Sequence, residues 1–143
     1  MALDAAARGL VSTLPESPDV SGIVVDVPST GGYATVVALA DGTTSMYTST
    51  GGGTIGAGTH AHVASATHRL LAEVQHHLGM FNMRDDRDMP PSGLVRFHVL
   101  TPSSGRRADV PLNAFWGQEG HALMPVITRV QEVITAISEA SPN

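Results

Sequence analysis

The chain of 143 residues contains no cysteine, and because all eight of its basic residues are arginines it contains no lysine either. The lack of cysteine excludes disulfide bonds, thiol catalysis and metal centres with cysteine ligands. The lack of lysine excludes Schiff-base chemistry and the phosphate-binding lysine of a P-loop. No run of apolar residues reaches the length of a membrane-spanning helix.

Basic charge is also scarce, since 13 acidic residues leave the chain with a formal net charge of −5. Arg106 and Arg107 form too small a basic cluster to neutralise a series of phosphates, so we expect no nucleic-acid partner. The N-terminus from Met1 to Arg8 carries an early acid instead of a basic region before an apolar stretch. These features favour a soluble cytoplasmic protein that has no membrane partner.

The length and a hydrophobic content of 42% predict a single domain over residues 1–143. Ala2 to Leu14 should form a short helix, and residues 1–18 as a whole should be an N-terminal helix and linker that dock loosely. Residues 82–92 concentrate charge and proline, and this composition is typical of an exposed internal loop.

Hydrophobic patterning predicts five strands and two further helices. The strands are expected at residues 22–28, 33–40, 44–50, 94–100 and 106–112, and the helices at residues 59–80 and 124–139. The order α-β-β-β-α-β-β-α has short connections between strands, so we expect an α+β fold with a five-stranded antiparallel sheet and flanking helices. Profilin-like and roadblock-like domains share this architecture loosely.

The sequence Asp41-Gly42 predicts a two-residue type I′ hairpin, which would place Leu39 opposite Thr44 and Val37 opposite Met46. Alternation then predicts one apolar surface formed by Ile23, Val25, Val27, Val37, Leu39 and Met46. The opposite surface would carry Val24, Asp26, Ala34, Val36, Ala38, Ser45, Tyr47 and Ser49. This second surface is too apolar for free solvent, so another element or another subunit should cover part of it.

A loop rich in glycine and threonine joins the third predicted strand to the following helix. One interpretation is an anion site made of loop amides at the positive end of the helix dipole. Its candidate ligand-binding residues are Thr50, Gly51, Gly52, Gly53, Thr54, Gly56, Gly58 and Thr59. The favoured alternative is structural: the glycines permit a sharp reversal and Thr59 caps the helix. A dinucleotide site is rejected, because the loop leaves a hairpin strand and no ribose-binding acid follows it.

Histidine and aspartate suggest two further kinds of site. His60 and His62 have the closest spacing to that of metal ligands, with His68, His98, Asp26 or the acidic loop as sources of a third ligand. Surface histidines are the simpler explanation, and we expect no metal and no cofactor. A four-residue turn at Pro102–Gly105 would place His98 opposite Asp109, where a carboxylate could orient an imidazole as a general base. A cross-strand surface pair is the simpler explanation, since no nucleophile can be named.

The stretch from Val37 to Gly58 contains Ala-Asp-Gly-Thr-Thr-Ser followed by Ser-Thr-Gly-Gly-Gly. It resembles a family of small uncharacterised bacterial proteins, and the resemblance extends through the strand of Phe97 and the terminal helix. It implies a shared fold and no catalytic residues.

Two hypotheses for function follow. The preferred one is a non-enzymatic interaction or regulatory module that forms a homodimer through the second sheet surface or the exposed side of a helix. The alternative is a protein or enzyme that binds a small anionic ligand with the Gly51–Gly58 loop.

Overall fold

The computed structural model describes the following residues: 15, 18–29, 32–49, 53–54, 60–83, 90–91, 93–102 and 104–140. The predicted helix from Ala2 to Leu14 lies outside these residues.

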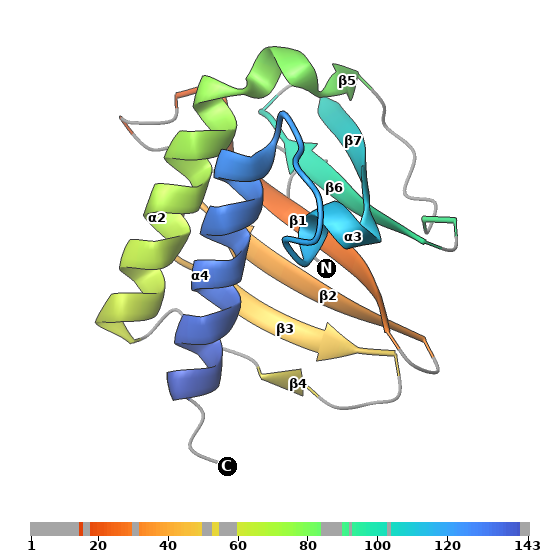
Figure 1. The fold of residues 1–143 in the computed structure, drawn as a ribbon. Helices are drawn as coiled ribbons and strands as arrows, with labels where there is room; N and C mark the ends of the chain where they lie inside the picture. The colour runs from red at the N-terminus through yellow and green to blue at the C-terminus, as the bar shows by residue number, and fades with distance from the viewer. Residues whose placement is uncertain are drawn as a thin grey trace.

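The described residues form one antiparallel sheet in the order β4-β3-β2-β1-β6-β7-β5 (Figure 1). Its strands are β1 (Gly22–Ser29), β2 (Gly32–Leu39), β3 (Thr44–Thr48), β4 (Gly53–Thr54), β5 (Asn82–Met83), β6 (Leu94–Leu100) and β7 (Gly105–Pro111). The predicted α+β class and antiparallel sheet are confirmed. The sheet has seven strands instead of five, because a two-residue strand lies at each edge.

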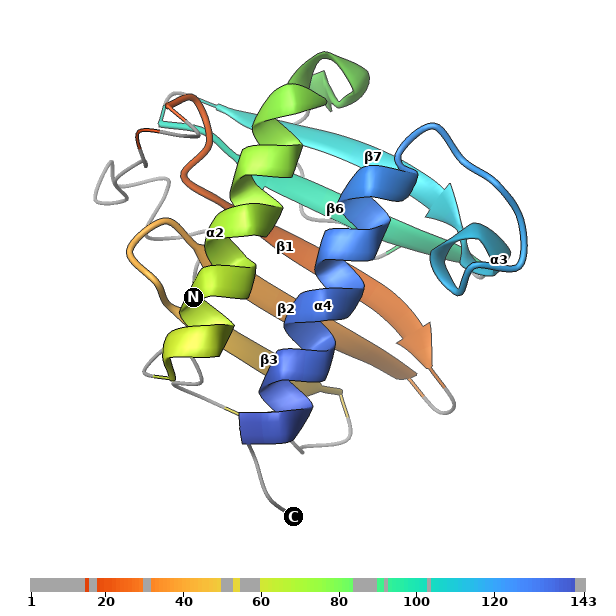
Figure 2. The same cartoon turned by 60° about the vertical axis from the view of Figure 1, so that its left-hand side comes forward.

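Two long helices, α2 (Ala61–His76) and α4 (Met124–Ala140), lie side by side and antiparallel over one face of the sheet (Figure 2). Both carry the apolar spacing that predicted them. A 3₁₀ turn, η2 (Leu78–Met80), follows α2, and a four-residue helix, α3 (Leu112–Phe115), follows β7. Among the described residues, no helix combines the length and the apolar character needed to cross a membrane.

Two ion pairs cross between the outer sides of α2 and α4. Arg69 lies 3.9 Å from Glu132, and Arg129 lies 3.8 Å from Glu73. Because these side chains are partly exposed, each pair contributes about 0–1 kcal/mol to stability. Burial of the apolar helix faces against the sheet therefore stabilises the packing of α2 and α4 more than these ion pairs do.

The main hydrophobic core lies between the two helices and the sheet. One polar contact crosses it, where the hydroxyls of Thr67 on α2 and Thr44 on β3 are 2.7 Å apart. Thr44 donates its single hydroxyl proton to the carbonyl oxygen of Gly42, so Thr67 is the donor to Thr44. This relay ties α2 to the turn between β2 and β3 without leaving either hydroxyl unpaired.

The register predicted for the Asp41-Gly42 hairpin, which joins β2 to β3, was wrong by one residue. The loop contains three residues, Ala40 to Gly42. The N–H of Leu39 closes it by donating to the carbonyl oxygen of Thr43 over 2.8 Å, and the N–H of Gly42 donates to the carbonyl oxygen of Leu39 over 2.9 Å. Gly42 has a φ of +96°, as expected for a turn followed by a bulge. Val36 therefore pairs with Met46, and Val37 pairs with Ser45.

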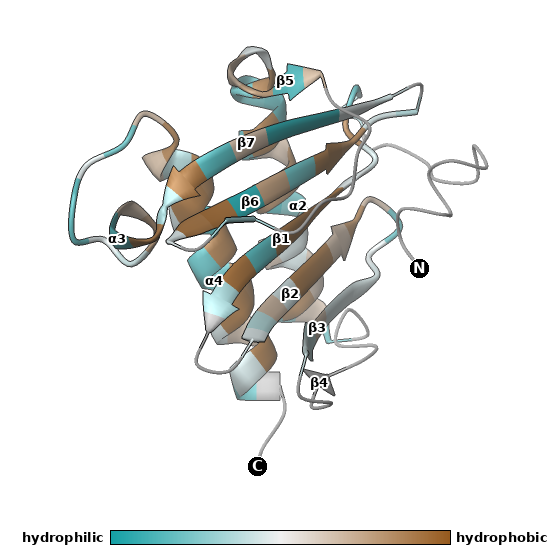
Figure 3. Ribbon diagram, turned by 90° about the vertical axis from the view of Figure 1, so that its right-hand side faces the viewer, coloured by the Kyte–Doolittle hydropathy of each residue, from teal (hydrophilic) through white to brown (hydrophobic). Residues whose placement is uncertain are grey.

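The one-residue slip reverses the two faces predicted for β2. Val36 and Ala38 belong to the core under the helices, whereas Val37 and Leu39 lie on the opposite face. The faces predicted for β1 hold, because Ile23, Val25 and Val27 face the helices. The face without helices carries a second, small hydrophobic cluster that consists of Val24, Val37, Leu39 and Leu100. Figure 3 views the sheet from this side.

Candidate functional site

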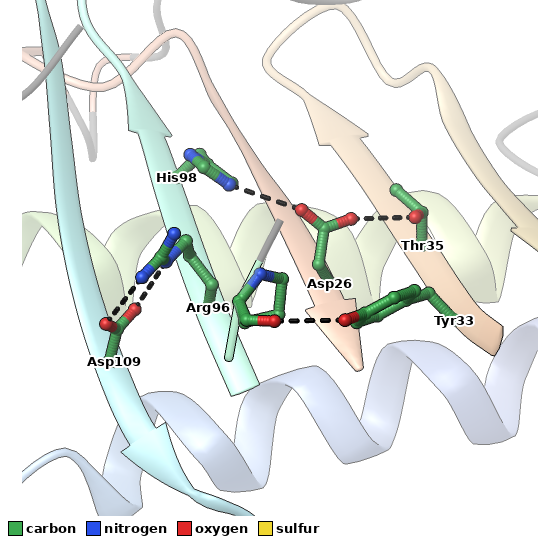
Figure 4. A network of polar contacts seen from close by, with 7 residues as sticks. Asp26, Tyr33, Thr35, Arg96, His98 and Asp109 are labelled. Atoms are coloured by element: carbon green, nitrogen blue, oxygen red, sulfur yellow. Dashed lines mark hydrogen bonds and ion pairs between the residues drawn. The ribbon is translucent and has the colours of Figure 1, made fainter. Parts of the chain in front are cut away.

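The face of the sheet opposite the helices carries a row of polar side chains. Strand pairing places Tyr47, Thr35, Asp26, Arg96 and Asp109 in line across β3, β2, β1, β6 and β7. We call these five residues the polar row; Figure 4 shows four of them together with His98. Charged residues are seldom deeply buried, so a row in which Asp26 and Arg96 are each only 6% exposed stands out.

Asp26 is the centre of this network. It is 6% exposed, and its two carboxylate oxygens have different partners. Oδ1 accepts a hydrogen bond of 2.7 Å from the hydroxyl of Thr35. Oδ2 lies 3.2 Å from Nε2 of His98, which is equally buried on β6. Both oxygens of a buried carboxylate are thus satisfied by side chains from the two neighbouring strands (Figure 4).

Arg96 and Asp109 form the second pair of the network. Nε and Nη2 of Arg96 donate to the two oxygens of Asp109 over 2.8 and 2.9 Å, a bidentate geometry. The hydrogen bond from Arg96 lowers the pKa of Asp109 below its ordinary value of 3.8, and the nearby charges of Arg96, Arg107 and His98 act in the same direction. Partial burial of Asp109 opposes this shift. Asp109 is therefore a carboxylate at neutral pH.

The predicted pair of His98 with Asp109 was wrong. The connection between β6 and β7 comprises residues 101–104 instead of Pro102–Gly105, because Thr101 closes it with hydrogen bonds to the N–H and C=O of Ser104. The connection has four residues in both cases, but its displacement by one residue shifts the register by two, so His98 lies opposite Arg107 and Arg96 lies opposite Asp109. The carboxylate that orients His98 is Asp26, on the other neighbouring strand.

A signal for this pairing was present in the sequence. Asp26 interrupts the apolar run from Gly22 to Pro28, and an acid at such a position needs a buried partner. The partner could not be named, since it depends on β1 lying beside β6.

The Asp26–His98 contact resembles the carboxylate–imidazole part of a general-base arrangement. Nδ1 of His98 makes no hydrogen bond to any described residue, and no described hydroxyl is placed to be activated by it. His98 is also only 5% exposed. The geometry therefore accounts for the pair as a buried polar link between strands, which is a structural role.

The metal hypothesis gains no support from the described residues, where no three histidine or acidic side chains converge. His60 occupies the N-cap position of α2 and His62 lies in its first turn. Their rings contact each other edge to face, with centroids 6.2 Å apart.

The candidate anion loop is described only at two positions. Gly53 and Thr54 form β4, whose backbone pairs with Tyr47 and Met46 of β3. The remaining candidates lie outside the described residues: Thr50, Gly51, Gly52, Gly56, Gly58 and Thr59. The predicted cap was wrong, since the N-cap residue of α2 is His60 instead of Thr59 and its side chain makes no capping hydrogen bond.

On the face of the sheet opposite the helices, side chains become more exposed from the central strands β1 and β6 towards β3. On β1 and β6, Val24, Asp26, Arg96 and His98 are buried. On β2, Tyr33, Thr35 and Val37 are half-buried, and on β3 Tyr47 is 40% exposed. We call Tyr33, Thr35, Val37 and Tyr47 the tyrosine patch, since it contains both tyrosines of the chain.

The predicted exposed loop at residues 82–92 has a buried end. Pro90 is buried, and its carbonyl oxygen accepts a hydrogen bond of 3.0 Å from the hydroxyl of Tyr33. This contact fixes the ring of Tyr33 at one border of the tyrosine patch. At the other end of the segment, Asn82 and Met83 pair with β7.

Comparisons with the profiles of known protein families, with curated proteins and with solved structures find no match for this chain. The function is therefore inferred from the geometry described above.

Proposed function

We propose that the protein is a non-enzymatic interaction module that associates with a second copy of itself through the tyrosine patch. The observation that carries this proposal is the position of Tyr47, which is 40% exposed on the face that α2 and α4 leave uncovered. Tyrosine is enriched in protein interfaces, because its ring offers a large contact area and its hydroxyl retains a polar partner.

The absence of charge on the tyrosine patch permits a second copy as the partner. The chain has a formal net charge of −5, so two copies repel each other unless they meet at a neutral surface. The tyrosine patch contains no ionised side chain. Among the described residues, Asp26 is the acid that contacts the patch, and it is buried and held by Thr35 and His98. As far as the described residues are concerned, two such patches can therefore meet without placing carboxylates against each other.

The patch is smaller than a complete interface. A stable dimer buries about 800 Å² on each partner, which exceeds the area that four side chains provide. The contact should therefore extend along β3 beyond Tyr47 to Ser49, which is exposed.

This proposal revises the residues that the sequence suggested for the dimer. Val36 and Ala38 are excluded because they face the helices, and Val24 is buried. Tyr47 remains. The loose likeness to profilin-like and roadblock-like domains, the bacterial family resemblance and a cytoplasmic location stay predictions that accompany this proposal, as does an anionic ligand at the Gly51–Gly58 loop.

Sedimentation or light scattering at micromolar concentration tests the proposal. The wild type should show twice the chain mass of 14.9 kDa. Tyr47→Glu would place a carboxylate against its copy, so this variant should be monomeric. Thr135→Glu adds the same charge at an exposed position of α4 and should remain dimeric. A monomeric wild type, or a dimer that survives Tyr47→Glu, would refute the proposal.

A further inference from the structure

A second surface is marked by the single tryptophan of the chain. The three phenylalanines, Phe81, Phe97 and Phe115, are at most 1% exposed, whereas Trp116 is 54% exposed. Trp116 follows α3 beyond the end of β7, and three strands separate β7 from β3 in the sheet. This surface is therefore distinct from the tyrosine patch.

The backbone around Trp116 is held in one conformation. The N–H of Trp116 donates to the carbonyl oxygen of Leu112 over 3.1 Å, and the N–H of Gly117 donates to that of Ala114. Gly117 has a φ of +78°, which glycine adopts readily and which ends the helix. The N–H of Gln118 returns to the carbonyl oxygen of Asn113 over 2.8 Å.

The indole ring is supported from the core. It meets the ring of Phe115 edge to face, with centroids 5.1 Å apart. Phe115 in turn packs on Phe97 of β6, and its carbonyl oxygen accepts a hydrogen bond from the side chain of Gln131 on α4. An exposed aromatic ring on such a support loses little conformational entropy when a partner binds.

The segment that follows Trp116 is exposed and carries one acidic side chain, Glu119. Residues 116–120 are all exposed. Glu119, three positions after Trp116, forms no ion pair with any described residue. An exposed aromatic ring followed three positions later by an exposed carboxylate offers a stacking face and a negative charge, which complement a group that is both planar and positively charged.

We propose that Trp116 and Glu119 bind an arginine side chain of a partner polypeptide. The guanidinium would stack on the exposed indole, and Glu119 would accept its N–H groups. Arginine fits better than lysine because its charge is spread over a plane that can stack and form two parallel hydrogen bonds. The net charge of −5 also attracts a basic segment.

Trp116 itself reports binding, since no other tryptophan contributes fluorescence. The probe is a short peptide of alternating glycine and arginine, titrated at low ionic strength. We expect a saturable change in the emission of Trp116 with this peptide and a weaker one with its lysine counterpart. The counterpart with neutral citrulline should give none. Glu119→Gln should weaken binding of the arginine peptide about fivefold, as expected for loss of one exposed charge pair.

Calorimetry extends the test to variants that lack the indole. Trp116→Leu keeps an apolar side chain without a π face and should abolish binding, whereas Trp116→Phe should retain part of it. Circular dichroism checks that both remain folded. The monomeric Tyr47→Glu variant should bind the peptide as the wild type does, which separates this test from that of self-association.

Three results would overturn the inference. They are equal binding of the arginine and citrulline peptides, full affinity in Glu119→Gln, and an emission that depends on protein concentration but not on peptide. The last result would assign the surface to a second copy of the chain.

Discussion

Nε2 of His98 lies 3.2 Å from Oδ2 of Asp26, although 72 positions separate the two residues in the chain. This contact joins β1 to β6 at the centre of the sheet, where both side chains are buried. It therefore couples the two parts of the chain that precede and follow α2.

Removal of the Asp26 carboxylate should be costly. Asp26→Ala leaves the half-buried hydroxyl of Thr35 and the buried imidazole of His98 without their shared partner, so we expect a loss of about 2–4 kcal/mol in the free energy of unfolding. Asp26→Asn keeps an acceptor for the hydroxyl of Thr35, so it should lower the free energy of unfolding by a smaller amount. Urea unfolding monitored by circular dichroism measures both. A cost below about 1 kcal/mol for Asp26→Ala would contradict the described network.

The Arg96–Asp109 pair predicts a pH dependence. The hydrogen bond from Arg96 holds the pKa of Asp109 below 3.8 in the folded chain, so the pair stabilises the fold above about pH 3.8. This contribution is lost as the pH falls from that value through the lowered pKa, because the unfolded chain takes up the proton first. The stability difference between wild type and Asp109→Asn should therefore shrink in this acidic range. A difference that stays constant between pH 7 and acid would be inconsistent with the shift.

Two buried hydroxyls should respond to mutation with opposite signs. Ser21 is fully buried and its hydroxyl makes no hydrogen bond with any described residue. Ser21→Ala should therefore raise the free energy of unfolding, by about 1 kcal/mol. Thr67 is equally buried, but it donates to Thr44. Thr67→Val keeps the shape and should lower stability by about 1 kcal/mol. Thermal unfolding of the two variants side by side tests the contrast, which equal signs would disprove.

Gly22 should tolerate no side chain. A Cβ atom there would lie 2.5 Å from Cδ2 of Leu39 and 2.9 Å from the carbonyl oxygen of Ala38. The backbone oxygen cannot move without disturbing the pairing of β1 with β2, so Gly22→Ala should cost about 1–3 kcal/mol. Gly120→Ala is the matched control, because a Cβ atom there meets nothing within 4 Å. If both variants unfold at the same urea concentration, the packing at Gly22 is not tight.

The sequence was most informative where a signal is local. The five long strands and the helices α2 and α4 follow from the spacing of apolar residues, and the turn at Asp41-Gly42 lies where these two residues predict it. The registers of the strand pairs could not be predicted from such local signals. Whether Gly42 ends a three-residue loop or belongs to a two-residue turn is a difference of one loop residue, yet it reverses the side chains of β2 relative to those of β3.

The candidate site was the part least open to prediction. Asp26, Arg96 and His98 come together only because β1 lies between β2 and β6, and no local pattern specifies that neighbour. The short edge strands β4 and β5 were missed for a related reason, since two residues carry no periodicity. Arg106 was considered only as part of a basic cluster, whereas its side chain donates to the carbonyl oxygen of Phe81 just before β5.

The central position of β1 also constrains how the molecule assembles. The hairpin of β6 and β7 gains its place in the sheet only by closing a long loop onto a strand made near the start of the chain, a step that is entropically demanding. Until that closure, the inner edge of β1 offers unpaired backbone groups to any other extended polypeptide. Because synthesis starts at the N-terminus, β1 is made before β6 and β7. During this stage the exposed edge of β1 can pair with strands of other chains, and only the later docking of the β6–β7 hairpin removes this risk.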